Sequence, residues 1–98
     1  MTTVFIYGGS GRFTGSQFEW ASPEFGSEHK FMLFLSQDRD EPMQEQALAE
    51  VRRFGFEDVQ LFEGRKILVE ALNQSAMAAF RQYYEGAFLD GSSLVWYP

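Results

Sequence analysis

The chain contains no cysteine and only one histidine, His29. The absence of cysteine excludes a disulfide framework and any thiolate metal site. One histidine cannot form a metal site by itself, so we expect neither a bound metal nor a cofactor. Basic residues are also few: eight Lys and Arg oppose 14 Asp and Glu, for a net charge of −6. Because phosphate binding requires a clustered basic face, we expect no nucleic-acid partner.

Long apolar runs are absent as well. No stretch approaches the roughly 18 consecutive apolar residues of a membrane-spanning helix. The first residues, Met-Thr-Thr-Val-Phe, lack the basic and then apolar segments of a signal peptide. We therefore expect no membrane contact and a cytoplasmic location. The length of 98 residues suits a single domain, and 45% apolar with 22% charged residues is ordinary for a globular protein.

Aromatic residues are plentiful, at 17% of the chain with 11 Phe. Five apolar residues follow one another without a break at Phe31–Leu35, inside the segment His29–Ser36. A run this short with polar flanks indicates a strand that is apolar on both faces. Such a strand belongs in the middle of a sheet that has cover on both sides.

The N-terminal part predicts a hairpin. Thr3–Tyr7 is β-branched and aromatic, which favours a strand. Gly8–Ser16 is rich in glycine and is predicted to be a long, mobile connection. Gln17–Trp20 alternates polar and apolar residues, as an edge strand does, and the following residues, with Pro23 and Gly26, predict a loop. On this interpretation residues 1–28 are an N-terminal hairpin and loop, added to a core of residues 29–98.

A helix is predicted over about residues 41–54. Asp38 or Asp40 is a suitable N-cap, and Pro42 suits the first turn. Gly55 is well placed as a left-handed terminator. One apolar stripe at helical spacing is formed by Met43, Ala47, Leu48, Val51 and Phe54.

Two interpretations fit the next part of the chain, after a strand at Val59–Phe62. In the first, Glu63–Arg65 is a hairpin turn, residues 66–71 run back as a strand, and a helix begins at Asn73 or Ser75. In the second, one long helix covers residues 66–88. We favour the hairpin, because Ile67 and its neighbours prefer strands. A final strand is predicted at Leu94–Tyr97.

The element order predicts an α+β fold. With the hairpin, residues 30–97 have the split βαβ order of a ferredoxin-like sandwich, and the N-terminal strand pair is an addition. With the long helix, the same residues form a βαβαβ unit of two or three layers.

The predicted strands have more apolar surface than the predicted helices can bury. Four of them are apolar on both faces, whereas we expect the two helices to cover only one face. The other face then needs cover from residues 13–28, from a second copy of the chain, or from a ligand. We favour a homodimer.

Two groups of residues are candidates for binding. The segment Tyr7–Gly15 resembles the glycine fingerprint of short-chain dehydrogenases, but no helix is predicted to begin within it, so we interpret it as a loop with Arg12 and Phe13 at its tip. The second group is His29 together with three rings that have polar ends, Tyr83, Tyr84 and Trp96.

No set of residues has the arrangement of a catalytic site, so catalytic residues are not assigned. The leading hypothesis is a small acidic protein that acts as a non-catalytic protein–protein interaction or regulatory module and binds itself or another protein. The alternative is a small cofactor-free enzyme, or a binder of apolar ligands, on a dimeric ferredoxin-like barrel. A cavity lined by the second group would favour the alternative; a filled core with an apolar outer patch would favour the interaction module.

Overall fold

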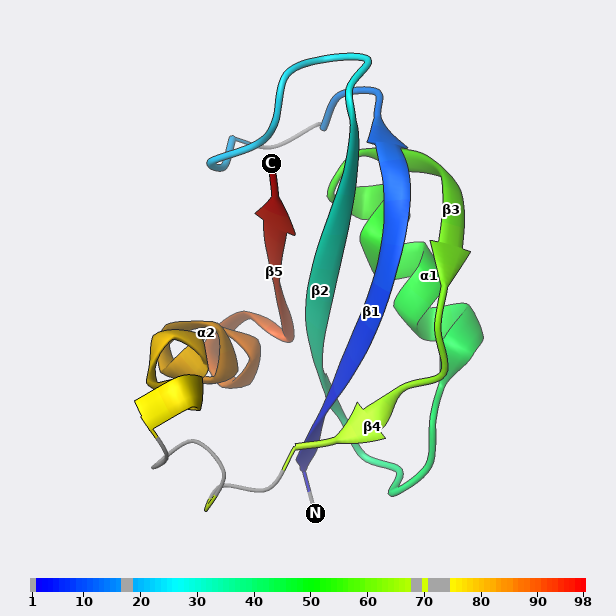
Figure 1. Cartoon of the computed structure of the whole chain (residues 1–98). Helices are drawn as coiled ribbons and strands as arrows, with labels where there is room; N and C mark the ends of the chain where they lie inside the picture. The colour runs from blue at the N-terminus through cyan, green and yellow to red at the C-terminus, as the bar shows by residue number, and fades with distance from the viewer. Residues whose placement is uncertain (1, 17–18, 68–69, 71–74) are drawn as a thin grey trace.

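A computed structural model describes residues 2–16, 19–67, 70 and 75–98. The described strands form one antiparallel sheet in the order β3-β1-β2-β5, and β4 also pairs with β1 (Figure 1). The strands are β1 (Thr3–Phe13), β2 (Glu28–Gln37), β3 (Phe56–Leu61), β4 (Arg65–Lys66) and β5 (Ser92–Tyr97). The helices are α1 (Gln44–Arg53), the short 3-10 helix η2 (Ser75–Phe80) and α2 (Arg81–Asp90). The predicted α+β class is confirmed.

Strand β2 is the predicted central strand, and both of its faces are buried. Phe31, Leu33 and Leu35 point to one face, where they join the larger core cluster. Phe34 points to the opposite face and joins a second cluster. Apolar residues at successive positions therefore serve two separate cores, as the unbroken run predicted.

Strand β1 corrects the prediction of an N-terminal hairpin. It continues through the glycines to Phe13 and lies between β2 and β3, so it is an interior strand and not an addition. Its hairpin partner is β2, whereas Glu19 and Trp20 are not in a strand, and Gln17 and Phe18 lie outside the described residues.

The glycines of β1 are explained by close packing. A Cβ atom on Gly9 would collide with the backbone oxygen of Gln60 on β3, and it would lie 3.1 Å from the ring of Phe31. Glycine in a strand often marks such a close approach. The glycine-rich composition predicted a mobile loop, but at Gly9 glycine is required because the neighbouring strand leaves no space for a side chain.

Helix α1 is confirmed, with a later start. Its N-cap residue is Met43, which makes no side-chain cap bond, so the prediction of Asp38 or Asp40 as the cap is wrong. The stripe is buried at Ala47 and Val51. Gly55 has a φ of 107°, the left-handed conformation expected after the helix.

Strands β3 and β4 lie one after the other along the same side of β1. Both are antiparallel to β1, so β4 continues in the direction of β3, and the predicted hairpin between them is not formed. The long helix over residues 66–88 is also wrong, because Lys66 is in β4 and the amide of Ile67 donates a hydrogen bond to Val4. Residues 68–69 and 71–74, including Asn73, lie outside the described residues.

The ferredoxin-like order is not confirmed. Strands β2 and β3 are both antiparallel to β1, so they run parallel to each other with β1 between them and α1 as their connection. This is a split βαβ unit, but its middle strand comes from the N-terminus. The alternative βαβαβ unit requires neighbouring parallel strands, whereas every pair among the described strands is antiparallel.

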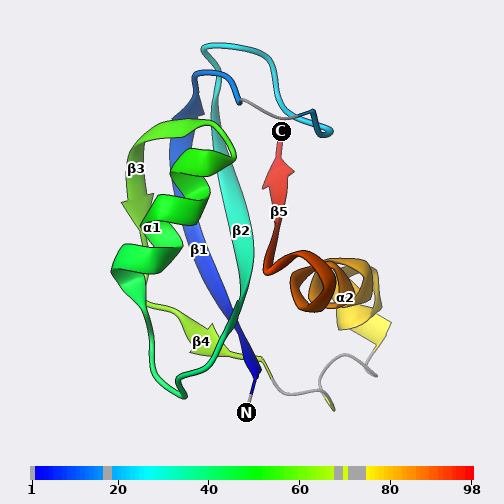
Figure 2. The ribbon, with the colours of Figure 1, turned by 180° about the vertical axis from the view of Figure 1, so that it is seen from behind.

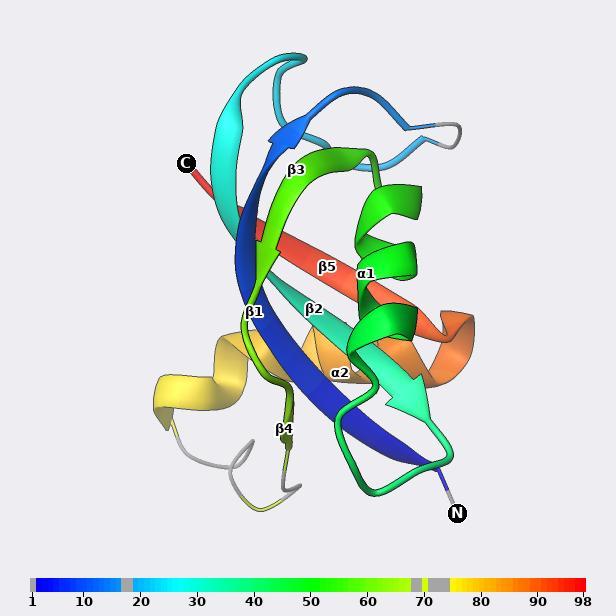
Figure 3. The same cartoon turned by 90° about the vertical axis from the view of Figure 1, so that its right-hand side faces the viewer.

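The two helices lie on opposite faces of the sheet, which corrects the expectation that both would share one face. Helix α1 packs on the cluster that contains Phe31 and Phe56, and it lies behind β1 in Figure 1 and in front of it in Figure 2. The cluster of Phe34 on the other face includes Ala87 of α2. Figure 3 shows the strands between α1 and η2, the short helix that precedes α2.

Candidate functional site

Helix α2 leaves much of its sheet face uncovered. It packs near Val4 and Phe34, at the end of the sheet where β1 begins. Toward the other end, alternate residues of the strands on the same face are half-buried or exposed. We call this surface the open face; its strand residues are Ile6, Gly8, Ser10, Arg12, Lys30, Met32, Val95 and Tyr97.

A hollow of about 800 Å³ lies at one side of the open face. Its walls are Ile6, Gly8, Met32, Phe62, Glu63, Gly64 and Arg65. The Phe62 side chain is 68% exposed although it is apolar, and it follows the end of β3, where its amide donates a hydrogen bond to the oxygen of Gly8. Tyr97, on the opposite side of the face, is 38% exposed. Exposed rings beside a hollow are typical of a binding surface.

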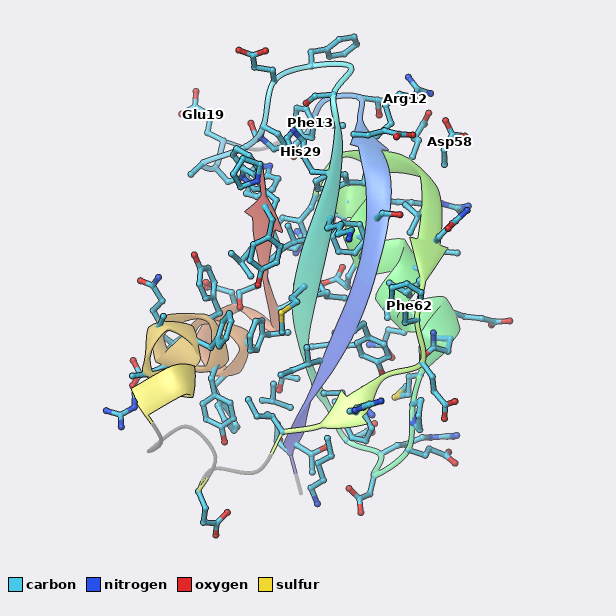
Figure 4. All side chains as sticks on the ribbon, viewed as in Figure 1. Arg12, Phe13, Glu19, His29, Asp58 and Phe62 are labelled. Carbon is cyan, nitrogen blue, oxygen red and sulfur yellow. The ribbon has the colours of Figure 1, made fainter. Side chains whose placement is uncertain are left out.

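Charged side chains surround this apolar part. At the far end, the guanidinium of Arg12 contacts the Asp58 carboxylate at 2.9 Å, and the two residues lie together in Figure 4. The hydrogen bond and charge of Asp58, followed by the charges of Glu57 and Glu28, raise the pKa of Arg12. Arg12 is therefore a permanent cation on the open face.

The charge of the open face is nearly balanced. It is bordered by three cations, Arg12, Lys30 and Arg65, and by four carboxylates, Glu28, Glu57, Asp58 and Glu63. These side chains give a net charge of −1, compared with −6 for the whole chain. Most of the acidic excess therefore lies on other surfaces.

The residues predicted at the loop tip have different positions. Arg12 is accessible on the open face, as described above. Phe13 is buried in the core, where its ring lies 5.7 Å from that of Phe56, so it is unavailable for binding. The error follows from the wrong assignment of this segment as a loop, since in a strand neighbouring residues point to opposite faces.

His29 and Trp96 are brought together, with ring centroids 4.8 Å apart. The Nδ1 of His29 lies 2.7 Å from the Tyr97 oxygen, and Nε2 lies 2.9 Å from the Ser27 hydroxyl. A carbonyl oxygen can only accept, so Nδ1 donates to it. Because both ring nitrogens are hydrogen-bonded, His29 has a structural role: it joins β2 to β5 and to the loop that precedes β2.

Tyr83 and Tyr84 lie on the other side of the sheet. They pack beside the cluster of Phe34, and the ring of Tyr83 is stacked on Phe34 with centroids 5.8 Å apart. Trp96 packs against the α1 cluster instead. The predicted group of rings therefore does not line one cavity, because the sheet separates its members.

Phe62 was not among the predicted site residues. It was predicted only as the last residue of an apolar strand. Its exposure depends on the end of β3 at Leu61 and on the course of the chain toward β4, and neither is visible as a local pattern. The one signal in the sequence was an apolar residue, Phe62, placed one position beyond the end of β3.

The chain matches no protein-family model, no curated protein and no solved structure. Within the described ranges, no helix has the length and apolar character needed to cross a membrane. In the same part of the chain, no group of three or more His, Asp or Glu side chains is arranged to hold a metal ion.

Proposed function

We propose that this protein is a non-catalytic interaction module that forms a homodimer through the open face. The observation that supports the proposal is the exposed ring of Phe62 beside the hollow. Burial of a phenylalanine side chain is worth about 1.5–3 kcal/mol, so exposure of the Phe62 ring, and of part of Tyr97 on the same face, is unfavourable without a partner.

A second copy of the chain is the occupant that the charges favour. Two molecules of charge −6 repel each other, and contact is least unfavourable through surfaces where that charge is smallest. The open face has a net charge of −1 and includes both cations and carboxylates, so a twofold arrangement can place Arg12 or Lys30 of one copy near a carboxylate of the other. The hollow has room for the Phe62 ring of the second copy.

The assignment as non-catalytic is supported by the positions of the polar residues. His29 uses both ring nitrogens in structural contacts. The buried Tyr7 hydroxyl is bonded to Met43 and to Gln37, which lies at the opposite end of β2 from His29.

The experiment is to measure mass by light scattering or sedimentation at increasing concentration. The unmodified chain is expected to reach twice 11.3 kDa, whereas Phe62→Glu stays at 11.3 kDa. Leu89→Glu is a matched control, because Leu89 is 85% exposed on α2 and lies outside the open face. Both variants should unfold at the urea concentration of the parent monomer.

Two results would contradict the proposal. One is an unmodified chain that stays monomeric at millimolar concentration. The other is a dimer that Leu89→Glu disrupts and Phe62→Glu leaves intact. A monomer whose Phe62 signals shift on addition of an apolar dye would instead identify the hollow as a ligand site, since its volume is in the usual range for ligands.

A further inference from the structure

The outer edge of β5 has backbone groups that no described strand pairs with. Strand β5 is the last in the sheet, and the backbone oxygen of Gly91 accepts a hydrogen bond from the amide of Ser36 on β2. In an antiparallel ladder, alternate residues face the same neighbour. The residues that point their N–H and C=O groups outward are therefore Ser92, Leu94 and Trp96.

The two edges of the sheet differ in how well they are protected against pairing with another strand. The edge formed by β3 and β4 is interrupted, with an irregular register opposite Ser10–Arg12 and a φ of 53° at Asp58. It also contains the charges of Glu57, Arg65 and Lys66, which discourage pairing with another strand. Strand β5 has the sequence Ser-Ser-Leu-Val-Trp-Tyr, with no charge and no proline. An unprotected edge is suited to pairing.

A second hollow, of about 650 Å³, lies along this edge. It is lined by Glu19, Trp20, Arg53, Phe54, Tyr83, Asp90, Ser92, Ser93 and Leu94. An added strand would thus enter a space with walls on both sides of the sheet. This differs from a bare edge, where only the backbone is available.

Aromatic rings form the wall on the α1 side. Trp20 and Phe54 meet edge to face, with centroids 5.2 Å apart, and both pack with the cluster that includes Leu94. The Nε1–H of Trp20 is buried and has no acceptor among the described residues. That donor is enclosed within the wall, so the rings of Trp20 and Phe54 offer apolar surface to the hollow, which suits an apolar side chain of an incoming strand.

The charges around the hollow favour a basic partner. Glu19 and Asp90 are exposed carboxylates. The one cation among the lining residues, Arg53, contacts the Glu50 carboxylate at 3.0 Å, and Glu50 also accepts a hydrogen bond from Ser92 at 2.7 Å. Glu19 and Asp90 are therefore exposed negative charges that can attract a cation on the partner.

We propose that the β5 edge binds an extended segment of another protein, in which apolar and basic residues alternate. The segment adds a strand to the sheet through the outward groups of Leu94 and its neighbours. An apolar side chain lies against Trp20 and Phe54, and the adjacent basic side chain lies on the other face, near Asp90. This partner site is separate from the open face and does not require the dimer.

The test uses a fluorescein-labelled peptide of about ten residues in which Val and Lys alternate, and measures its polarisation with the full chain. Binding should saturate. Two further peptides are N-methylated at alternate residues, one at odd positions and one at even positions. Only one set of amides faces β5 in an added strand, so one methylated peptide should lose roughly tenfold or more in affinity and the other should bind nearly as the parent does.

Variants of the protein test whether the residues that line the hollow contribute to peptide binding. Trp20→Ala should weaken binding by roughly tenfold. Asp90→Lys should also weaken it and is safe for folding, because a cation at the end of α2 suits the helix dipole. Phe25→Ala, at a ring that is 77% exposed and outside the hollow, is the control and should leave affinity unchanged. The monomeric Phe62→Glu chain should bind the peptide as the parent does, so failure of the dimer and failure of this site give different results.

The inference is overturned if the alternating peptide does not bind. It is also overturned if both methylated peptides bind equally, since contact would then not involve an added strand. A peptide with Glu in place of Lys that binds as tightly as the Lys peptide would refute the assignment of a basic partner.

Discussion

The hydroxyl group of Tyr7 joins β1 to the start of α1. Tyr7 is fully buried, and its hydroxyl donates to Oε1 of Gln37 at 2.7 Å and accepts from the Met43 amide at 2.8 Å. Gln37 in turn donates to the oxygens of Arg39 and Glu41 at 2.8 and 2.6 Å. Since Met43 has no side-chain cap, this buried network substitutes for a cap and holds the loop that precedes the helix.

Substitution Tyr7→Phe keeps the ring and removes only the hydroxyl. Two hydrogen bonds are lost, and the Gln37 oxygen and Met43 amide are left without a partner, each at about 1–3 kcal/mol. Because Met43 is only partly buried, we expect a total loss of about 2–4 kcal/mol in the free energy of unfolding. For a domain of this size the melting temperature should fall by roughly 10–25 °C.

Urea unfolding followed by tryptophan fluorescence measures the loss. Tyr97→Phe is the control, because the one hydrogen bond of that hydroxyl within the described part of the chain is to the sulfur of Met32, at 3.1 Å, in an exposed position; a change below about 0.5 kcal/mol is expected. In a double-mutant cycle, Gln37→Met combined with Tyr7→Phe should be less destabilising than the sum of the single changes. The reasoning is refuted if Tyr7→Phe has an effect as small as Tyr97→Phe, or if the two changes at the network are additive.

Two further predictions follow from the burial of Tyr7. Burial raises the pKa of Tyr7 above 10.0, against the opposing effect of the Met43 hydrogen bond, and burial also raises the pKa of Tyr97. The folded chain then binds more protons than the unfolded chain above about pH 10, so stability should be complete below that pH and fall as pH rises through the folded pKa values. Urea midpoints measured from pH 8 to 11 test this, and a fall that is equally steep in Tyr7→Phe would contradict it. Gly64→Ala should destabilise by about 1–3 kcal/mol, because its Cβ would collide with the ring of Tyr7. Gly8→Ala has 3.7 Å to its nearest neighbour and is the control; equal urea midpoints for the two alanine variants would contradict the collision.

The strands and the first helix could be predicted where a local pattern is sufficient. The run Phe31–Leu35 indicated a strand with two buried faces, and Leu94–Tyr97 indicated a strand at the end of the chain; both are confirmed. The spacing of Ala47 and Val51 indicated the buried side of α1. These features depend on the period of the side chains along the backbone, which is a property of the segment itself.

The candidate site was predicted less well, because it depends on contacts between distant segments. Gly9 and Gly11 have a loop composition, yet β3 lies against them so closely that a side chain on Gly9 has no space. Once that stretch is a strand, Phe13 points into the core and Arg12 points to solvent. The exposed ring of Phe62 likewise depends on where β3 leaves the edge of the sheet.

The pattern of apolar residues along each segment specifies whether that segment is apolar on one side or on both, and therefore that the sheet has two faces to bury. The position of β1 between β2 and β3, and the placement of one helix on each face, arise only when the segments pack together. The periodicity of a segment specifies its own buried side but not the segment that packs there. In this protein that choice depends on contacts between distant segments, such as the close approach of β3 to Gly9 and the cluster that includes both Ala87 and Phe34, and such contacts exist only when the whole chain is folded.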